Sequence, residues 1–524
     1  MNNNSGFLFW PDRKFTQGET LDFSLLRPKR SSKEVREILA EAKNAGIKLS
    51  ILGHLRGVDG CGSSLDLPEF QRRLTPIGIT DWQKLPSTPT IASEFCVEVK
   101  FEKADNPEII EYIAPDYGCS ETNPYIVDNQ VETTPEGKVI GGQLDAAAYI
   151  FRNLFGLKGI KITCGGISAV ALAGGMESSN VFNIALLAGA SILSGCNLSL
   201  AEIFSLAVKL ECDEFSGNTG GQGHLCCMTG GAFRHVWLSG IKSADGKLIN
   251  PYSAISIPLL NAKQLKLFEK NTLLVQAGKK YKNGKAELGR TASLINNIWT
   301  DLLRDKDPVG LELHNEKLGL TDKYTQFLTE GDYSRVVECV SRYVEIRDEL
   351  CCRWVKLMLS AKNGQNVPEY AKKYAEKVFD KNNSWYSDNE PIRKILDQYG
   401  EKSDSMSLYS LEPIASLISD GKKHQIALMP LGAGGPGSNL FAISPNGREH
   451  LEKFLHANDL SEIIEDEARK IVRGSGILKG YIPFKSSVDP LKIEGFKQLG
   501  MDLPAFPEEV DLNGIVLNNI KNQN

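Results

Sequence analysis

The hydrophobic and polar positions of this chain form apolar runs and longer mixed segments that follow no single repeat. The apolar run 181–193 has helical length, whereas the shorter runs 159–163 and 439–443 have the length of strands. A charged segment at 32–45 predicts a helix, and helix signals recur at 460–472. Because strands and helices do not alternate regularly, the pattern predicts an α+β fold rather than a doubly wound sheet.

A glycine-rich segment separates the predicted strand 159–163 from the predicted helix 181–193. It reads Gly174-Gly175-Met176-Glu177-Ser178-Ser179-Asn180. Glycines let the main chain approach a phosphate, and the N–H groups that open a helix attract anions. A serine can cap such a helix while leaving a hydroxyl free for a metal or a phosphate oxygen. We therefore expect the residues from Gly174 to Ser179 to cradle a triphosphate.

A second glycine-rich segment precedes the predicted strand 439–443. It reads Gly432-Ala433-Gly434-Gly435-Pro436-Gly437-Ser438-Asn439. Neither segment contains GxxxxGK[ST], and neither is a GxGxxG that opens a strand–helix unit with an acidic residue about 20 positions later, so the P-loop and dinucleotide motifs are excluded. A single glycine cluster is commonly a turn. Two in this order are typical of the kinase family named next, and that resemblance implies a shared nucleotide site to which Gly432, Gly434, Gly435 and Gly437 contribute.

The order of the two segments resembles the GHMP superfamily of small-molecule kinases, which carry a G-L-G-S-S-A loop and a late G-A-G-G-G-G loop. The fucokinase and heptose-phosphate kinase branch is closest in pattern. Its T-G-G-G-W-Q-D-Q motif is similar to Thr219-Gly220-Gly221-Gln222, followed by the pair Gly230-Gly231. The run 272–279 resembles its L-L-V-Y-T-G-K strand, and Gly331-Asp332-Tyr333 resembles its helix-opening G-D-F. The resemblance covers roughly residues 70 to 455, in patches.

This resemblance implies a two-lobed GHMP kinase fold that uses ATP and magnesium. It places ATP between the two glycine-rich segments and Gly434 near the substrate. It places Ser178 or Ser179, with one of Glu211, Asp213 or Glu214, near the magnesium. It divides the chain into an N-terminal extension (1–70), an N-terminal lobe (71–240), a C-terminal lobe (241–455) with an insertion near 363–407, and a C-terminal extension (456–524).

The position of the family's catalytic aspartate is where this sequence departs from the resemblance. The run Gly220-Gly221-Gln222-Gly223-His224 contains no aspartate. An alignment without a gap places His224 there, a gapped one places Gly223, and Asp213 fits only if the glycine match is abandoned. His224 could act as general base, because neutral imidazole near pH 7 accepts a hydroxyl proton. Phosphoryl transfer can also proceed by positioning alone, and a histidine in a loop can simply be a structural hydrogen-bonding residue.

The acceptor side departs from the branch as well. The branch shapes its sugar pocket with an early R-x-D and a G-G-W-x-D-T-P-P run, whereas this chain has Asp81-Trp82. A carboxylate suits sugar hydroxyls and an indole suits a ring face, so both residues are candidate substrate contacts. A surface turn before a strand is the alternative. Glu177 places a negative charge beside the expected triphosphate, which is unfavourable unless it reaches a metal or points outward.

Composition narrows the function classes. The formal net charge of -5 and the absence of a concentrated basic block exclude general nucleic-acid binding. The run 181–193 is too short to span a bilayer, and the polar start predicts no secretory signal, so a cytoplasmic location without membrane contact is expected. The 11 cysteines show no disulfide or zinc spacing and are expected to be small buried hydrophobes.

We therefore expect an ATP-dependent sugar kinase that transfers the γ-phosphate to a hydroxyl of a monosaccharide or sugar phosphate, with the anomeric hydroxyl as leading acceptor. The alternative is a pseudokinase that binds nucleotide or sugar in a regulatory or scaffolding role. The missing aspartate keeps this alternative open. The partners expected are therefore a nucleotide and a small-molecule sugar.

Overall fold

A computed structural model provides the coordinates, and every structural statement below concerns the residues that it describes. These are residues 5–11, 16–17, 20–21, 26–75, 81–115, 119–135, 138–165, 176, 178–215, 220–241, 252–278, 281–282, 285–286, 291–383, 385–387, 389–400, 408–410, 412–432, 434, 439–463 and 477–512.

Strands and helices alternate without a regular order, as the α+β prediction requires. The strands are β1 (Ser5–Phe9), β2 (Thr16–Gln17), β3 (Thr20–Leu21), β4 (Ser50–Val58), β5 (Ser87–Lys103), β6 (Ile110–Ile113), β7 (Tyr125–Val127), β8 (Ile160–Gly165), β9 (Ala232–Trp237), β10 (Ala254–Pro258), β11 (Thr272–Gly278), β12 (Tyr281–Lys282), β13 (Lys285–Ala286), β14 (Ala427–Pro430), β15 (Leu440–Ile443), β16 (Ile477–Pro483), β17 (Lys492–Glu494) and β18 (Glu509–Asp511). The α-helices are α1 (Ser32–Asn44), α2 (Pro68–Leu74), α3 (Gln143–Tyr149), α4 (Ser178–Ser194), α5 (Leu200–Lys209), α6 (Gln222–Thr229), α7 (Ala262–Lys270), α8 (Thr291–Arg304), α9 (Pro308–Glu330), α10 (Tyr333–Lys362), α11 (Glu369–Phe379), α12 (Glu390–Tyr399), α13 (Ile414–Lys423) and α14 (Arg448–Ala457).

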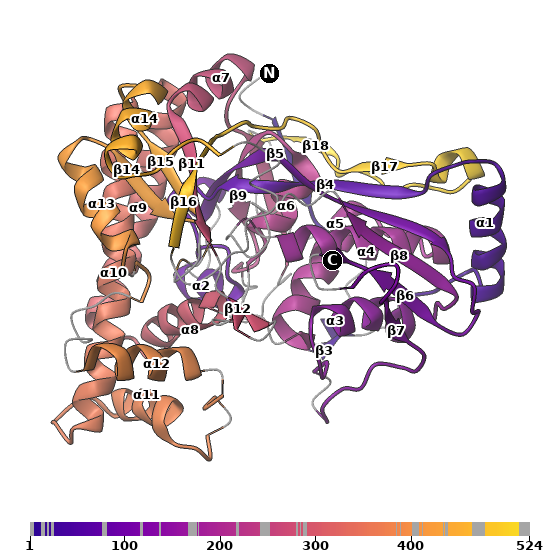
Figure 1. Cartoon of the computed structure of the whole chain (residues 1–524), viewed down its shortest axis with the longest axis horizontal. Helices are drawn as coiled ribbons and strands as arrows, with labels where there is room; N and C mark the ends of the chain where they lie inside the picture. Colours follow the sequence, from indigo (N-terminus) through magenta and orange to yellow (C-terminus); the bar gives the residue numbers. More distant parts are fainter. Residues whose placement is uncertain are drawn as a thin grey trace.

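A ten-stranded sheet forms one side of the molecule (Figure 1). Its order is β18-β1-β10-β9-β5-β8-β6-β7, with β4 paired to the other edge of β5 and β17 paired to β4. The 17-residue strand β5 organises this sheet, because its first half pairs with β9 and its second half pairs with β8. Helices α4 and α6 pack against β4 and β5, and α4 is buried along nearly its whole length.

A four-stranded sheet of order β14-β15-β11-β16 forms the centre of the second lobe. Strands β14 and β15 are antiparallel neighbours, so the late glycine-rich segment is the connection between them. The Leu431 N–H donates to the Asn439 carbonyl at 2.8 Å and closes the base of this connection. The strand predicted at 439–443 is confirmed as β15.

Both ends of the described chain belong to these sheets. Strand β1 pairs with β10 and β18, β17 pairs with β4, and β16 pairs with β11. The regions expected to be terminal extensions, 1–70 and 456–524, therefore contribute strands to both lobes. Alternating apolar positions in short strands near the ends of a chain do not reveal which distant strand they pair with.

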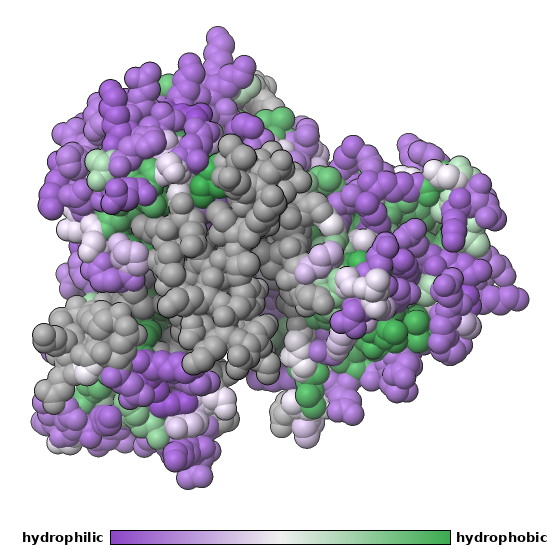
Figure 2. Space-filling model, viewed as in Figure 1, coloured by the Kyte–Doolittle hydropathy of each residue, from purple (hydrophilic) through white to green (hydrophobic). Residues whose placement is uncertain are grey.

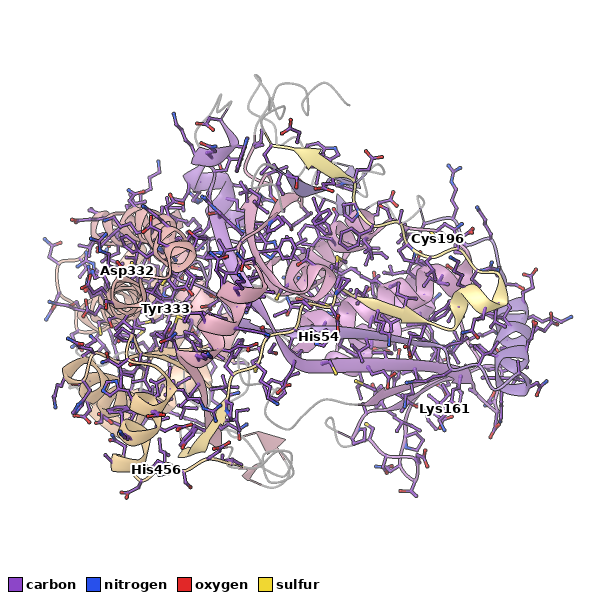
Figure 3. The ribbon with its side chains drawn as sticks, turned by 90° about the horizontal axis from the view of Figure 1, so that it is seen from above. His54, Lys161, Cys196, Asp332, Tyr333 and His456 are labelled. Carbon is purple, nitrogen blue, oxygen red and sulfur yellow. The ribbon has the colours of Figure 1, made fainter. Side chains whose placement is uncertain are left out.

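The long helices α9 and α10 stand beside the second sheet as an antiparallel pair. Asp307 caps α9 ahead of Pro308, Gly331 ends it in a left-handed conformation, and Asp332 caps α10. The predicted helix opening at Gly331-Asp332-Tyr333 is thus confirmed. In Figure 3, Asp332 and Tyr333 lie on the helical side of the molecule, whereas Lys161 and Cys196 lie on the sheet side.

Most other predicted elements agree with the structure. The helices expected at 32–45 and 181–193 are α1 and α4, and the expected insertion contains α11 and α12. Residues 460–463 are not helical, so the start of the helix predicted at 460–472 is wrong, and 464–472 lie outside the described residues. No helix in the described part is both long enough and apolar enough to cross a membrane. On the face drawn in Figure 2, hydrophilic residues predominate, with small hydrophobic patches between them.

Candidate functional site

A buried loop of residues 59–66 joins β4 to α2, and we call it the convergence loop because elements of both lobes meet on it. Backbone bonds from Gly62 N–H to the Asp59 carbonyl and from Leu65 N–H to the Gly62 carbonyl shape its turns. Gly62 lies against Thr88, where a Cβ atom would come within 2.9 Å of the Thr88 Cα. This tight packing places Ser63, Ser64 and Asp66 in fixed positions.

The start of α6 docks on the convergence loop. The Gln222 N–H donates to Asp66 Oδ2 at 3.1 Å, and a Cβ on Gly220 would lie 1.8 Å from the same oxygen. Only glycine therefore fits at position 220. Burial raises the pKa of the Asp66 carboxyl, and the Gln222 N–H opposes that rise. Gly220 thus lets the start of α6 dock directly on a buried carboxyl group.

His224 lies in the first turn of α6 and is fully buried. Its Nδ1 lies 3.0 Å from the Asn180 side-chain nitrogen, and its Nε2 lies 3.6 Å from Glu211 Oε2. Asn183 donates to the other oxygen of Glu211. The network joins the start of α4, the π-helix at Leu210–Glu214 and α6. The general-base role of His224 stays a prediction, and these contacts correspond to the structural alternative.

The residues expected near magnesium are only partly described. Ser178 opens α4 and is almost fully buried, while the side chain of Asp213 lies outside the described part. Glu211 is engaged by Asn183 and lies beside His224. Within the described residues no group of three or more histidine, cysteine or acidic side chains could hold a metal ion. The assignment of Glu211 to the magnesium therefore stays a prediction.

The late glycine-rich segment reaches the convergence loop from the other lobe. The Gly432 carbonyl accepts a bond from Arg347 Nη2 at 2.5 Å and a longer one from Ser63 Oγ at 3.4 Å. Gly434 has a φ of +76°, and a Cβ there would lie 2.0 Å from the Tyr409 ring. Position 434 therefore requires glycine for both backbone and packing reasons. Gly174, Gly175, Glu177, Gly435 and Gly437 lie outside the described residues.

Helices α9 and α10 insert two basic side chains into this region. Lys317 donates to Ser64 Oγ at 2.5 Å and to the Ser63 carbonyl at 3.4 Å. Arg347 donates to Tyr409 and to Gly432. Both side chains are fully buried, and burial together with Arg347 holds the pKa of Lys317 well below its usual value. Because these bonds end on neutral oxygens, the two side chains hold backbone and hydroxyl groups in place.

Asp59 supplies an unsatisfied acceptor at the other end of the convergence loop. It is fully buried, and within the described residues neither of its carboxylate oxygens has a hydrogen-bond partner. Arg56 Nη2 lies 3.9 Å from its Oδ2, too far for a hydrogen bond. A buried carboxylate without donors is costly, so this group is suited to receive hydroxyl donors from a ligand.

The predicted substrate contacts Asp81 and Trp82 make other contacts. Asp81 accepts from the Gln83 N–H at 3.0 Å and caps the 3-10 turn Trp82–Lys84. The Trp82 indole donates to the Leu512 carbonyl at 3.2 Å and packs with a small apolar cluster around Leu85. These contacts match a surface turn before β5, and the structure does not bring the pair onto the convergence loop.

Sequence reasoning missed the convergence loop and the basic side chains that hold it. A signal was present, because the run Gly60-Cys61-Gly62-Ser63-Ser64 follows an apolar strand. Lys317 and Arg347 gave no signal, since each is one charged position among many in a long helix.

Comparison with known proteins yields structural likeness only. No protein-family model and no curated protein sequence matches the chain. Solved structures do match over most of its length. They include GHMP kinases. A D-glycero-D-manno-heptose 1-phosphate kinase from Bacteroides thetaiotaomicron is 12% identical with a TM-score of 0.45, covering 84% of this chain and 97% of its own.

Two further structures match at similar levels. A Listeria innocua protein is 14% identical with a TM-score of 0.49, covering 85% of this chain and 99% of its own. A Lactococcus lactis galactokinase, solved with galactose, is 11% identical with a TM-score of 0.44, covering 86% of this chain and 98% of its own. The mixed α+β fold with two sheets is seen directly in the present structure.

Proposed function

We propose that the protein is an ATP-dependent kinase of a sugar or sugar phosphate, with the nucleotide between the two glycine-rich segments. The supporting observation is a continuous chain of contacts between those segments. The first turn of α4 contacts His224, α6 docks on Asp66, and the convergence loop bonds the Gly432 carbonyl. These bonds join residues that lie between 44 and 369 positions apart in the sequence.

In this proposal the acceptor hydroxyl oxygen forms a bond to the γ-phosphorus while the bond from that phosphorus to the bridging oxygen breaks and ADP leaves. The hydroxyl proton goes to His224 if that residue is the base, and otherwise to solvent. Ser178 and Ser179 open α4 where its N–H groups and dipole favour a phosphate. Asp59 would accept hydrogen bonds from acceptor hydroxyls, because within the described residues it is ion-paired with Arg56 but accepts no hydrogen bond. Asp81 and Trp82 remain the sequence-based alternative for this contact. Magnesium enters only as part of Mg-ATP.

The direct experiment pairs calorimetry with a sugar-panel ADP-release assay. Mg-ATP should bind, whereas Mg-AMP, which lacks the β- and γ-phosphates, should bind at least about tenfold more weakly, a difference of about 1.4 kcal/mol. At least one sugar should stimulate ADP release. In Asp59→Asn, the KM for that sugar should rise while nucleotide affinity is retained. No Mg-ATP binding at millimolar concentration would remove the proposal.

A pseudokinase is the second candidate, and the burial of His224 favours it. His224→Gln separates the roles, since glutamine can bridge Asn180 and Glu211 but cannot take a proton near neutral pH. If His224 is the base, this variant should lose at least about a hundredfold in turnover. Retained turnover would show that His224 has a structural role, in the contacts with Asn180 and Glu211. Nucleotide binding without turnover on any sugar would favour the pseudokinase.

A further inference from the structure

The side chains that surround the late glycine-rich segment form a bracket, which we define as Arg347, Tyr409 and Ser63. Arg347 Nη1 donates to the Tyr409 hydroxyl at 2.9 Å, and that hydroxyl donates to the Pro430 carbonyl at 2.9 Å. Arg347 Nη2 donates to the Gly432 carbonyl. One guanidinium thus holds the segment at two points, directly at Gly432 and through Tyr409 at the end of β14.

Aromatic rings fix the guanidinium in this position. Its central carbon lies 4.1 Å from the Tyr409 ring centroid, 4.4 Å from that of Trp299 and 5.1 Å from that of Tyr343. A planar cation stacked in this way loses little freedom on bonding and keeps its fork aimed in one direction. Arg347 is therefore a rigid support for the segment.

The same Tyr409 ring also sets the path of the segment beyond Gly432. Gly434 lies so close to the ring that a Cβ would approach its atoms to 2.0 Å. Its positive φ and the ring contact together fix the backbone where the predicted nucleotide loop begins. Ser63 from the first lobe bonds the Gly432 carbonyl as well, so the bracket also relates this segment to the convergence loop.

We infer that Arg347 and Tyr409 are positioning residues that hold the late glycine-rich segment in its nucleotide-binding conformation. The inference rests on the proposed function and adds two residues outside both glycine motifs. They act through the backbone at Pro430, Gly432 and Gly434, and the inference gives them no contact with the nucleotide. Loosening the bracket therefore lowers nucleotide affinity even though the phosphate-binding groups are unchanged.

The experiment measures Mg-ATP affinity of the full chain by calorimetry in a matched pair of variants. Tyr409→Phe keeps the ring and removes the hydroxyl that links Arg347 to Pro430. Tyr374→Phe is the control, because Tyr374 is also fully buried on the helical side and its hydroxyl bonds Asp305 at 3.1 Å. Loss of the two hydrogen bonds of the Tyr409 hydroxyl should weaken Mg-ATP binding about five- to tenfold, whereas Tyr374→Phe should leave binding within about twofold of the parent.

Outcomes separate this inference from the proposed function. If the parent protein binds no Mg-ATP, the proposed function itself is wrong. A parent that binds, with Tyr409→Phe unchanged or with both variants weakened equally, overturns the inference alone. If Tyr409→Phe does not fold, Arg347→Lys replaces it, because lysine keeps the charge but lacks the planar fork whose two nitrogens separately bond Tyr409 and Gly432. Arg347→Lys should weaken binding at least about tenfold, and unchanged binding overturns the inference.

Discussion

The two glycine-rich segments are supported in different ways. The early segment leads into α4, whose start is held by Asn180 and Asn183 against His224 and Glu211. These contacts join residues 44 and 28 positions apart within the first lobe. The late segment is held through the Gly432 carbonyl by residues 85 and 369 positions away, from α10 and from the first lobe.

The difference teaches where the site depends on local folding and where it depends on the docking of the lobes. The support of α4 can form as soon as the helices of one lobe pack together. The support of Gly432 is complete only when the convergence loop, α10 and the second sheet are all in place. The nucleotide site should therefore be more sensitive to changes at the lobe contact than to changes at the periphery of either lobe.

The largest effect is expected at Gly220, which lies between the two supports. Gly220→Ala would drive a Cβ into the buried Asp66 carboxyl, so α6 or the convergence loop must move. Overpacking of this kind should lower the free energy of unfolding by about 3 kcal/mol, measured by urea denaturation. Gly319→Ala is the control, because nothing lies within 4 Å of its Cβ and alanine favours α9 by up to about 1 kcal/mol. Equal stability of the two variants would contradict the assigned docking of α6.

The sequence predicted the local half of this arrangement better than the long-range half. Strands β8 and β15 and helices α1 and α4 follow from patterns that act over a few positions, whereas β11 and the start of α10 are expected from the family resemblance. The bracket does not, because nothing near Arg347 in the chain indicates that its guanidinium meets Gly432. Asp81 and Trp82 drew attention by residue type, whereas Asp59, the carboxylate proposed for the acceptor, became visible only because its oxygens accept no hydrogen bond in the described structure.

A smaller effect concerns the pH dependence of stability that comes from His235, a buried histidine in the large sheet. His235 lies in the large sheet with Thr90 Oγ1 and Ser256 Oγ each 2.8 Å from a ring nitrogen. Burial lowers the pKa of His235 to about 3. The unfolded chain protonates this histidine near pH 6.5 and the folded chain does not, so stability must fall as pH drops from about 6.5 towards 3.

This contribution can be isolated by substitution. Between pH 6.5 and 5, His235 should account for a loss of about 2 kcal/mol in the free energy of unfolding. Urea denaturation of His235→Gln at both ends of this range should show a loss of stability that is smaller than that of the parent by about this amount. A slope in His235→Gln identical to that of the parent would show that the folded protein protonates His235 as readily as the unfolded chain.

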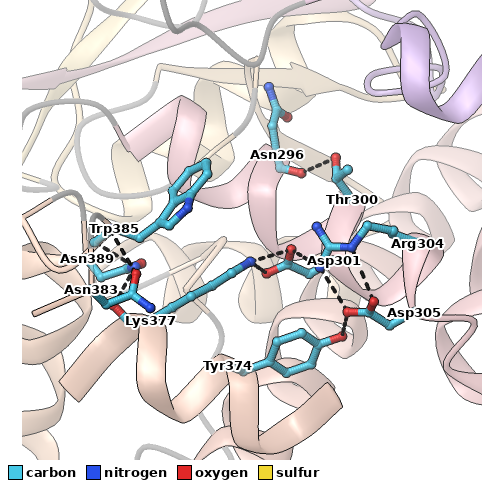
Figure 4. A network of polar contacts seen from close by, with 10 residues as sticks. All are labelled: Asn296, Thr300, Asp301, Arg304, Asp305, Tyr374, Lys377, Asn383, Trp385 and Asn389. Atoms are coloured by element: carbon cyan, nitrogen blue, oxygen red, sulfur yellow. Dashed lines mark hydrogen bonds and ion pairs between the residues drawn. The ribbon is translucent and has the colours of Figure 1, made fainter. Parts of the chain in front are cut away.

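The smallest effect tests the expectation that the periphery matters less to the nucleotide site. The network in Figure 4 joins α8 to α11, where Lys377 bonds both oxygens of Asp301 at 2.7 and 2.8 Å. Arg304 also bonds Asp301 at 2.8 Å, so Lys377→Met leaves the carboxylate paired and should cost only about 1 kcal/mol of stability. Lys372→Met, on the exposed face of the same helix, should change stability by less than about 0.5 kcal/mol.

Both variants should bind Mg-ATP like the parent, because neither lysine contacts the bracket or the convergence loop in the described residues. A loss of affinity in Lys377→Met would show that α11 also helps to position the late segment, and that the periphery matters to the nucleotide site as the lobe contact does.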